Sequence, residues 1–460
     1  MLRPALLLFV ATAPLAAQTT TYTGTSGSVW SAPAHWAEGL PSGEGRADLV
    51  FFNTSTGTTL TSHNDLSGLV VRSLTFPAKS ADNVLAGNAL TLTQGITVAA
   101  GNWQAIQLPL ELPPGPHAFD VRNGRLTIAS VISGPGLLSK TGGATLVIEK
   151  ANTHSGGTTV NSGVIRLASG GPAGALRGTL TINSGGGVLS QARDSLGFEP
   201  GLKVDRLFIT EGYLTHESAE NLTFSSLSLH LSGGTVKSTQ AGAIDLYNAV
   251  AIGGPDQRTT IETSPSAKTS TLAGRLNLRQ GDDDPVGTVI TVADGPAETD
   301  LRISAVIADG KDQGRHSVLQ KLGPGRLELA AANTYTGATI LRAGTLALGV
   351  DHALSPSAPL ILHEGQLAVG SHALRTGPLD LQGPVTLTLE DGAQLSLAAT
   401  ANTPWPATAR LRILGRFKDE FSLRFGTSET GLTMEQLARI TINDRPACID
   451  TLGYLSALPE

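Results

Sequence analysis

The feature that most constrains the fold of this chain is one segment that occurs twice. Residues 140–167 (KTGGATLVIEKANTHSGGTTVNSGVIRL) recur without a gap at residues 321–348 (KLGPGRLELAAANTYTGATILRAGTLAL). The likeness extends upstream, where residues 126–132 match residues 301–307, with a short insertion before the lysine of the second copy. Short units that recur in this way are typical of proteins in which each unit packs on its neighbours and insertions fall in turns.

Each copy has the pattern of short strands joined by tight turns. Its apolar residues occur at a spacing of two, which places both members of a pair on one face of a strand. The pairs are Leu146 with Ile148, Leu327 with Leu329, and Leu346 with Leu348. Weaker fragments of the same pattern lie between the copies and beyond them, and no segment after the N-terminal region shows a convincing helical period.

We therefore expect an all-β chain that folds as a right-handed parallel β-solenoid. One coil cannot bury its own inward face, whereas coils stacked at about 4.8 Å join their strands into continuous sheets. Coils of roughly 20–25 residues would give a shaft on the order of 70–90 Å. Asn152 and Asn333 are expected at coil corners, where asparagine accepts left-handed backbone geometry or bonds to neighbouring turns. A ligand-binding role for them is the weaker alternative.

Composition agrees with many short strands and tight turns. Glycine contributes 54 of 460 residues, well above the usual share of about 7%, while charged residues make up only 15%. The net charge of −6 is spread without long runs, which excludes the basic stripe of a nucleic-acid-binding protein. The single cysteine, Cys448, excludes an internal disulfide framework. Stability must therefore come from packing and backbone hydrogen bonds.

The N-terminal residues have the layout of a secretory signal peptide. Arg3 gives a basic start, an apolar run follows at residues 5–13, and small residues precede a cleavage site expected near Ala17. The run is shorter than the roughly 20 residues that a membrane-spanning helix needs. We expect an exported chain without a transmembrane segment in its mature form.

We divide the chain into three parts. The expected parts are a signal peptide at residues 1–17, a β-solenoid at residues 18–405 with repeats near 126–167 and 301–348, and a small C-terminal cap at residues 406–460. Within the cap, Thr433 and Gln436 have the spacing of a capping box at the start of a short helix. This helix would protect the open edge of the last coil.

The repeated segment also resembles a known family. In both copies a lysine, a glycine and a short strand precede an asparagine-threonine motif, which reads NTHSGGT at residues 152–158 and NTYTG at residues 333–337. This order resembles the autotransporter-associated β-strand repeat, also called the passenger-associated transport repeat. The resemblance implies a β-solenoid exported to the surface or surroundings of a Gram-negative bacterium. The residues that carry it, all expected to be structural, are Lys140, Leu146, Asn152, Gly156, Gly163, Lys321, Leu327, Asn333, Gly337 and Gly344.

The two ends of the chain also resemble such exported proteins. Trp30 and Trp36 are expected to cover the first coil, with sugar stacking as the weaker alternative for them and for Trp103 and Trp405. Autotransporter passengers are followed by a membrane barrel, and some relatives end in a sorting tail whose beginning resembles residues 458–460. The resemblance leaves two alternatives, a released protein or an anchor encoded beyond the last residue.

The sequence contains few patterns that are typical of catalytic sites. The only acidic cluster, Asp282 to Asp284, lies between Gly281 and Pro285 and is expected to be a solvated turn, and His363-Glu364 lacks the second histidine of a zinc motif. We predict no catalytic residue, no cofactor and no metal. The expected function is that of a non-catalytic structural or adhesin-like protein with polysaccharide or cell-surface partners. The alternative is a polysaccharide-active β-helix enzyme, a lyase or hydrolase with an unrecognised site; the oligomeric state stays open.

Overall fold

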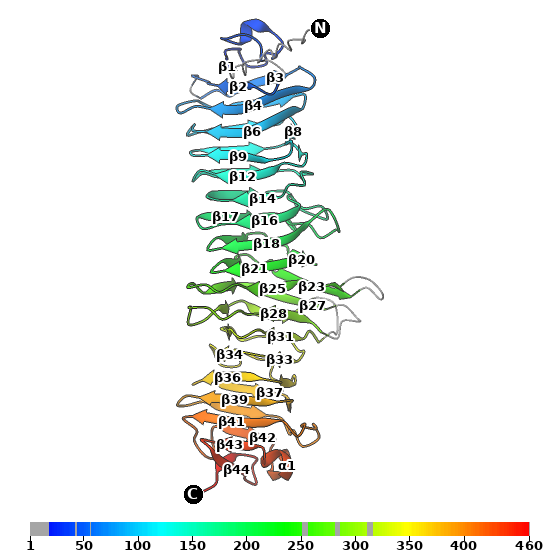
Figure 1. The fold of residues 1–460 in the computed structure, drawn as a ribbon, viewed down its shortest axis with the longest axis vertical. Helices are drawn as coiled ribbons and strands as arrows, with labels where there is room; N and C mark the ends of the chain where they lie inside the picture. Colours follow the sequence, from blue (N-terminus) through cyan, green and yellow to red (C-terminus); the bar gives the residue numbers. More distant parts are fainter. Residues whose placement is uncertain are drawn as a thin grey trace, which may run out of the picture.

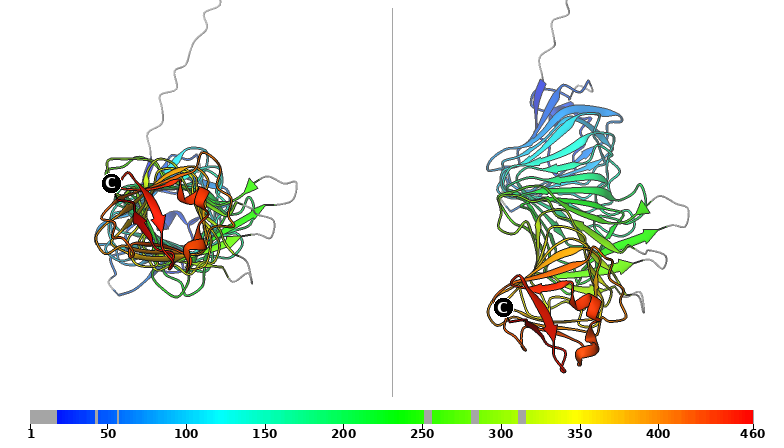
Figure 2. Two further views of the ribbon diagram at one scale, coloured as in Figure 1. Left: turned by 90° about the horizontal axis from the view of Figure 1, so that it is seen from below. Right: turned by 60° about the horizontal axis from the view of Figure 1, so that its bottom comes forward.

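The computed structural model is an elongated shaft of stacked coils, with its first described strand near one end and the C-terminus at the other (Figure 1). It describes residues 18–41, 44–55, 57–250, 256–280, 286–310 and 316–459. The expected signal peptide and Asp282 to Asp284 lie outside these ranges. The chain makes about 16 turns, which at about 4.8 Å per turn gives a shaft of about 75 Å. Viewed along the shaft, successive turns superpose (Figure 2).

One side of the shaft is a long parallel sheet, here called sheet A, to which nearly every coil contributes one strand. Each strand pairs in parallel with the equivalent strand of the next coil, as in the register of Leu138 with Thr158 and of Thr158 with Leu180. Its strands are β1 (Gln18–Tyr22), β2 (Ala47–Phe51), β4 (Leu69–Phe76), β6 (Leu90–Val98), β9 (Pro116–Val121), β12 (Leu137–Thr141), β14 (Thr158–Val160), β16 (Gly178–Ile182), β18 (Val204–Thr210), β21 (Ser228–Ser232), β25 (Thr260–Thr263), β28 (Thr288–Thr291), β31 (Leu319–Leu322), β33 (Thr339–Leu341), β35 (Leu360–Leu362) and β38 (Leu379–Leu381).

The second side, sheet B, follows sheet A around each coil and is also parallel. Its strands are β3 (Leu60–Asn64), β5 (Asn83–Gly87), β7 (Trp103–Ile106), β10 (Arg125–Ile128), β13 (Thr145–Ile148), β15 (Gly163–Leu167), β17 (Gly186–Ser190), β19 (Tyr213–His216), β22 (Thr235–Ser238), β26 (Ser270–Ala273), β29 (Leu301–Ile303), β32 (Arg326–Leu329), β34 (Thr345–Leu348), β36 (Gly365–Gly370), β39 (Pro384–Leu389), β41 (Arg410–Gly415) and β43 (Ile440–Ile442).

The third side of the coil is less regular. Short strands β8 (Leu110–Glu111) and β11 (Ile132–Ser133) pair in parallel there, and β8 is continuous with sheet A through its pairing with the start of β6. Strand β24 (Asp256–Gln257) forms an antiparallel hairpin with β23. The longer parallel groups are β20 (Leu222–Ser225), β23 (Ile244–Val250), β27 (Arg275–Gln280) and β30 (Val306–Asp309), and then β37 (Ala373–Thr376), β40 (Gln394–Leu397) and β42 (Leu423–Phe425). Strands β23 and β27 extend beyond the outline of the shaft (Figure 1).

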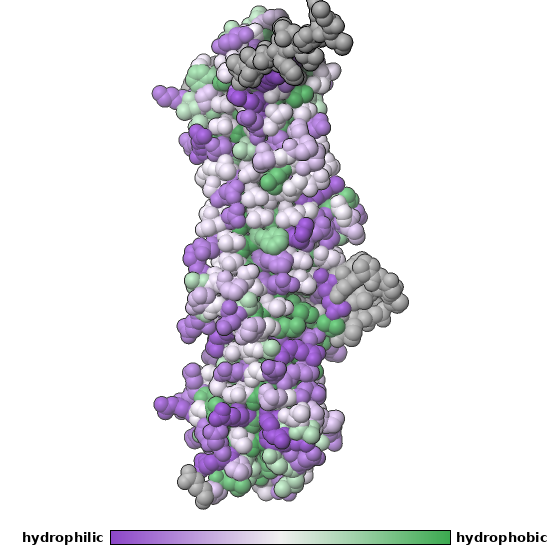
Figure 3. All heavy atoms as spheres, in the orientation of Figure 1, coloured by the Kyte–Doolittle hydropathy of each residue, from purple (hydrophilic) through white to green (hydrophobic). Residues whose placement is uncertain are grey.

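The core is a set of apolar ladders that run along the shaft. In sheet B, Leu301 pairs in register with Leu327 and Leu327 with Leu346, and the ladder continues through Leu367 and Leu387. All five side chains are buried. The alternation of inward apolar and outward residues follows directly from the spacing of two in the sequence. The outer face in Figure 3 is mostly polar or composed of small residues.

Aromatic residues close the N-terminal end of this core. Trp30 and Trp36 are buried, and their rings contact each other edge to face with centroids 5.8 Å apart. Both rings also pack on Phe51, the last residue of β2. The short helix η1 (Pro33–His35) leads into Trp36. The two tryptophans therefore cover the first coil, as expected.

The C-terminal end is closed by η2 (Glu429–Gly431), the single turn α1 (Met434–Leu437), and the antiparallel strands β44 (Arg445–Ile449) and β45 (Leu455–Ala457). The expected capping box is present: the backbone N–H of Gln436 donates to Thr433 Oγ1 at 3.1 Å, and the N–H of Thr433 donates to Gln436 Oε1 at 2.8 Å. Parallel stacking continues through β41 and β43, so the segment after residue 405 adds further rungs before it closes the stack.

The structure is thus the expected parallel β-solenoid, all-β with 2% helix. Within the described ranges it has no helix with the length and apolarity needed to span a bilayer.

Candidate functional site

The lysine at the start of each repeat occupies an inward position of sheet A. Lys140 follows Phe119 and precedes Val160 in an otherwise apolar ladder, and its side chain is fully buried. Its ammonium group is satisfied by three backbone carbonyls. Lys140 Nζ donates to the oxygens of Thr141 at 2.6 Å and Gly142 at 2.7 Å in its own coil, and to Ser162 at 3.1 Å in the next coil. The lysine therefore ties two coils together at one corner.

The second copy repeats this geometry. Lys321 Nζ donates to the carbonyl oxygens of Leu322 at 3.2 Å, Gly323 at 2.6 Å and Ala343 at 2.9 Å. Burial lowers the pKa of Lys140 and of Lys321 to about 8, against the opposing effect of one nearby carboxylate in each case. We call these two arrangements the lysine clamps.

The glycine that follows each clamp leaves room for the ammonium group. A Cβ atom on Gly163 would lie 2.8 Å from Lys140 Nζ and 2.4 Å from the carbonyl oxygen of Gly142. Gly344 stands in the same relation to Lys321, at 2.7 Å, and both glycines have a positive φ, 69° and 71°. Both positions therefore require glycine for conformation and for space. Gly156 and Gly337 allow a different close approach, since a Cβ on either would lie within 2.5 Å of the backbone of the preceding coil.

The two asparagines bridge coils at another corner. Asn152 Oδ1 accepts from the backbone N–H of Ile132 at 2.7 Å, and its Nδ2 donates to the carbonyl of Ala175 at 3.0 Å. One residue in the preceding coil and one in the following coil are thus joined through a single buried side chain. Asn333 makes the equivalent bonds to Ile307 at 2.8 Å and Ala353 at 2.7 Å. Two structural roles were expected for these asparagines, left-handed backbone geometry or hydrogen bonds to neighbouring turns, and the structure has the second.

The aromatic position of the motif points into the core in both copies. Tyr335 is buried and its hydroxyl lies 2.5 Å from Thr339 Oγ1, while His154 is buried with its Nε2 3.1 Å from Thr158 Oγ1. Burial lowers the pKa of His154 to about 4 and raises the pKa of Tyr335 to about 12. Both groups are therefore neutral at neutral pH.

The ten repeat residues consequently form two equivalent sets, one in each copy of the repeat, and none of them lines the outer groove described next. Leu146 and Leu327 lie in the sheet B ladders. A third buried lysine, Lys203, also donates to carbonyls of the next coil, at Ser225 and Ser226. Sequence reasoning missed it because its surroundings do not match the motif.

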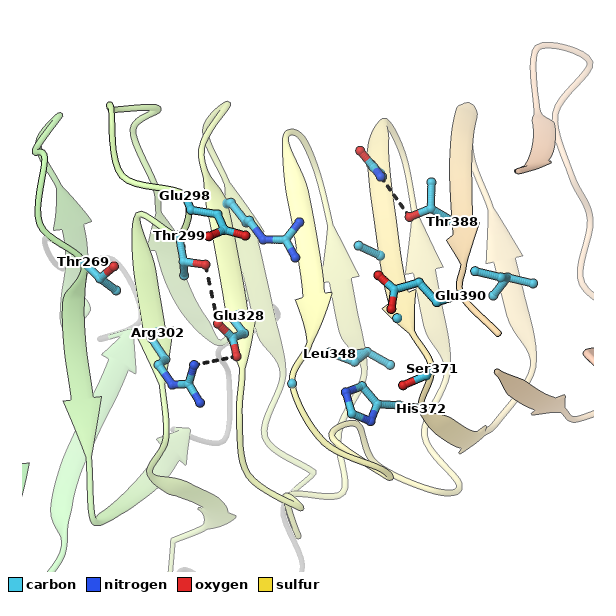
Figure 4. A pocket seen from close by; sticks show the side chains of 16 residues that line it. Thr269, Glu298, Thr299, Arg302, Glu328, Leu348, Ser371, His372, Thr388 and Glu390 are labelled. Carbon is cyan, nitrogen blue, oxygen red and sulfur yellow. Dashed lines mark hydrogen bonds and ion pairs between the residues drawn. The ribbon is translucent and has the colours of Figure 1, made fainter. Parts of the chain in front are cut away.

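A groove of about 620 Å³ lies on the outer face of sheet B in the second half of the shaft (Figure 4). It exists because several of the outward residues that line it are small. In register across five strands, the outward positions are Arg302, Glu328, Ala347, Ala368 and Thr388. The small lining residues Ala368, Gly349 and Gly370 leave a hollow between larger polar side chains, while Ala347 is buried beneath the surface. Only the register reveals the groove, because its residues lie far apart in sequence.

The groove walls carry charges of both signs. On one side Arg302 Nη1 and Glu328 Oε1 form an ion pair at 2.9 Å, and Glu298 and Arg326 lie nearby. On the other side lie Ser371, His372 and Glu390 (Figure 4). Within the described part of the chain, the side chains of Glu298, Arg326 and Glu390 make no hydrogen bond or ion pair, and those of Glu298 and Glu390 are exposed.

A second, smaller hollow lies beside strands β20 and β23. Its buried carboxylate, Asp245, accepts hydrogen bonds from Asn221 at 3.0 Å and Asn277 at 2.7 Å, and Arg279 lies 3.5 Å away. These bonds occupy the carboxylate, so this cluster fastens the irregular third side of the stack.

The remaining residues singled out from sequence have structural surroundings. Trp405 is buried and its Nε1 donates to the carbonyl of Leu379 at 3.2 Å, and Trp103 is half-buried with its Nε1 2.9 Å from Thr127 Oγ1. His363 lies 2.9 Å from an Arg342 nitrogen, and burial, followed by that guanidinium, lowers the pKa of His363. Among the described residues, no three histidine, cysteine or carboxylate side chains group as metal ligands.

The fold and the clamps place the chain among parallel β-solenoids whose coils are fastened by buried polar side chains. Comparison with known families is more specific. Residues 138–167 and 319–348 match the family model of the passenger-associated-transport-repeat, so the chain carries two copies of that repeat. The match confirms the resemblance seen in the sequence. Neither the comparison with curated proteins nor that with solved structures finds a match.

Proposed function

We propose that this chain is the passenger of an exported surface protein and acts as a stiff, non-catalytic scaffold with adhesin-like contacts. The observation that carries the proposal is the use of the repeat residues. The two lysine clamps and the two asparagine bridges are buried, and their side chains form hydrogen bonds that join adjacent coils. The repeat therefore builds length and stiffness, and the outer faces remain available for contact.

Export and surface exposure belong to the same proposal. The family that matches both repeats takes its name from autotransporter passengers, and residues 1–17 have the pattern of a signal peptide. We infer that the shaft is displayed at or released from the surface of a Gram-negative bacterium. Polysaccharides and cell-surface components are the proposed partners, through many weak contacts along the shaft.

The spacing of carboxylates in the groove favours contact over turnover. Three rungs separate Glu328 on β32 from the strand that precedes Glu390, which corresponds to about 14 Å along the shaft. Glycosidases place their two carboxyl groups about 5–9.5 Å apart. Glu328 is also engaged by Arg302. This pair is therefore poorly arranged for glycoside hydrolysis.

A polysaccharide-active enzyme is the second candidate, favoured by the same groove. Glu298 and Glu328 belong to adjacent coils, and Thr299 next to Glu298 lies 3.5 Å from Glu328. A pair of carboxylates on neighbouring coils is the minimum that such an enzyme would need.

Incubation of the full chain with a panel of neutral and acidic polysaccharides distinguishes the two candidates. We expect retention on polysaccharides or on whole cells, with no release of reducing or unsaturated ends over time. Steady release of such ends that grows with protein concentration would support the enzyme instead. Absence of binding to every polysaccharide and cell type would contradict the adhesive part of the proposal.

A further inference from the structure

The groove on sheet B has a direction as well as a volume. Its lining residues come from six successive strands, β26 to β39, or from the turns next to them, so the hollow runs along the shaft (Figure 4). Five rung spacings amount to about 24 Å. An elongated ligand that lies along the shaft would fit this shape better than a compact one.

The chemistry of the lining restricts the class of ligand. A peptide strand finds no main-chain partner here, because the strands beneath the groove are already paired on both sides. The apolar side chains in the lining, Leu348, Ala368 and Leu389, are buried, so the groove offers no deep apolar pocket for a peptide side chain. The walls carry three glutamates and two arginines, so the groove has no excess of positive charge for nucleic acid or for an acidic polymer.

What remains is a ligand rich in hydroxyl groups. The side chains of Glu298 and Glu390 can accept hydrogen bonds from hydroxyls, and Arg326 can donate to hydroxyl oxygens. None of these three side chains forms a hydrogen bond or an ion pair with another described residue. The small residues Gly349, Ala368 and Gly370 keep large side chains off the floor, so a sugar ring can lie across it. Acceptors and donors on both walls, on either side of a smooth floor, suit an extended neutral glycan.

We propose that the outer groove of sheet B binds a linear, uncharged oligosaccharide lying along the shaft, with Glu298, Arg326 and Glu390 as its hydrogen-bonding contacts. The proposal rests on the adhesive function proposed above and assigns it a site and a ligand class. It places recognition on the second half of the shaft, away from the first repeat.

The test measures the binding of neutral hexasaccharides (cellohexaose, xylohexaose and mannohexaose) and of hexagalacturonate to the full chain by calorimetry. We expect a dissociation constant below about 1 mM for at least one neutral hexasaccharide. Because the ligand is uncharged, that constant should change less than about two-fold between about 50 and 500 mM salt. Binding of hexagalacturonate alone, with a strong salt dependence, would overturn the ligand class. Absence of any neutral binding would overturn the site proposal.

Two kinds of variant locate the site. Ala368→Phe fills the hollow from an outward position and is expected to weaken neutral-glycan binding at least about ten-fold. Leu189→Phe, at an outward position of β17 in the same sheet, is the matched control and should leave affinity unchanged. The double variant E298Q/E390Q leaves the floor intact and should weaken binding about five- to ten-fold, so the test survives if Ala368→Phe folds poorly.

Cell binding separates a failure of the site from a failure of the function. In one outcome, the wild type binds cells, and both variants, Ala368→Phe and E298Q/E390Q, bind cells and oligosaccharides as well as the wild type does. The groove is then not the binding site, although the adhesive function stands. If the wild type binds neither cells nor oligosaccharides, the adhesive function itself fails.

Discussion

Gly163 lies directly against the ammonium group of Lys140, so that a single methyl group on the glycine would reach within 2.8 Å of Nζ. The pair comes from adjacent coils, and it recurs as Gly344 and Lys321. A buried charge, its three carbonyl acceptors and a glycine that makes room for it therefore form one unit. This unit explains why the repeat requires a lysine on one coil and a glycine at the matching corner of the next.

Gly163→Ala should destabilise the first clamp. The new Cβ would meet carbonyl oxygens at 2.4 and 2.5 Å and would hold an L-residue at a φ of +69°. We expect a loss of about 2–4 kcal/mol in the free energy of unfolding, measured by denaturant titration. Gly143→Ala is the control, because a Cβ there meets nothing within 4 Å. Equal stability of the two variants would show that the close approach at Gly163 is not real.

Lys321→Met should weaken the junction between two coils. Methionine fills similar space but leaves the carbonyls of Leu322, Gly323 and Ala343 without their donor. Hydrogen bonds to charged groups contribute about 1.5–3 kcal/mol each, and we expect a net loss of about 2–3 kcal/mol. Amide hydrogen exchange should become faster around residues 322–325 and 343–345. Lys150→Met, at an exposed position, should change neither quantity; a similar loss there would point to a general effect of lysine removal.

Asn333→Ala should release the amide of Ile307, whose N–H donates to Asn333 Oδ1 at 2.8 Å. A buried donor left without a partner costs about 1–3 kcal/mol. The Ile307 amide should lose protection in hydrogen exchange followed by mass spectrometry. Asn333→Asp keeps the acceptor for Ile307 but sets a carboxylate against the carbonyl of Ala353, so it should not restore stability. Full protection of Ile307 in the alanine variant would refute the bridge.

His154 should make the first repeat sensitive to acid. The folded chain holds the pKa of His154 at about 4, below its ordinary value of 6.5, so between these values the unfolded chain binds more protons than the folded one. This contribution to stability is complete above pH 6.5 and is lost as the pH falls toward 4. At about 1.36 kcal/mol per pKa unit, the loss amounts to about 3 kcal/mol.

The two repeats supply their own control for this prediction. His154→Tyr installs the residue that occupies the equivalent position in the second copy, and should flatten the decline of stability over the acidic range in which His154 titrates. Tyr335→His should steepen it. Unfolding curves at several pH values measure both, and identical pH profiles for the wild type and both variants would remove His154 from the explanation.

Much of the fold could be predicted from sequence because the inward positions repeat at a spacing of two. Leu146, Ile148, Leu327 and Leu329 all lie in the buried ladders, as their spacing indicated. The capping box of Thr433 and Gln436 could also be predicted, since the two residues lie close together in the sequence.

The roles of polar residues were harder to predict. Lys140 and Lys321 stood out as repeated residues, but a lysine in a strand ordinarily faces solvent. Its inward direction depends on three carbonyls, one of which a turn of the next coil supplies, and no local pattern contains that information. The outer groove could not be predicted for a related reason. Glu328 and Thr388 are seen to line the same groove only when the register of four coils is known.

The register of the coils can be measured directly with spin-label pairs in a Cys448→Ser background. One label is placed at Ser139 on the outer face of sheet A, and the other in turn at His230, Glu262 and Thr291, which lie four, five and six rungs further along the same outward ladder. We expect backbone separations of about 19, 24 and 29 Å, an increase of about 4.8 Å for each rung, in pulsed electron resonance. Separations that do not increase in this order would contradict a single continuous stack of parallel, in-register strands.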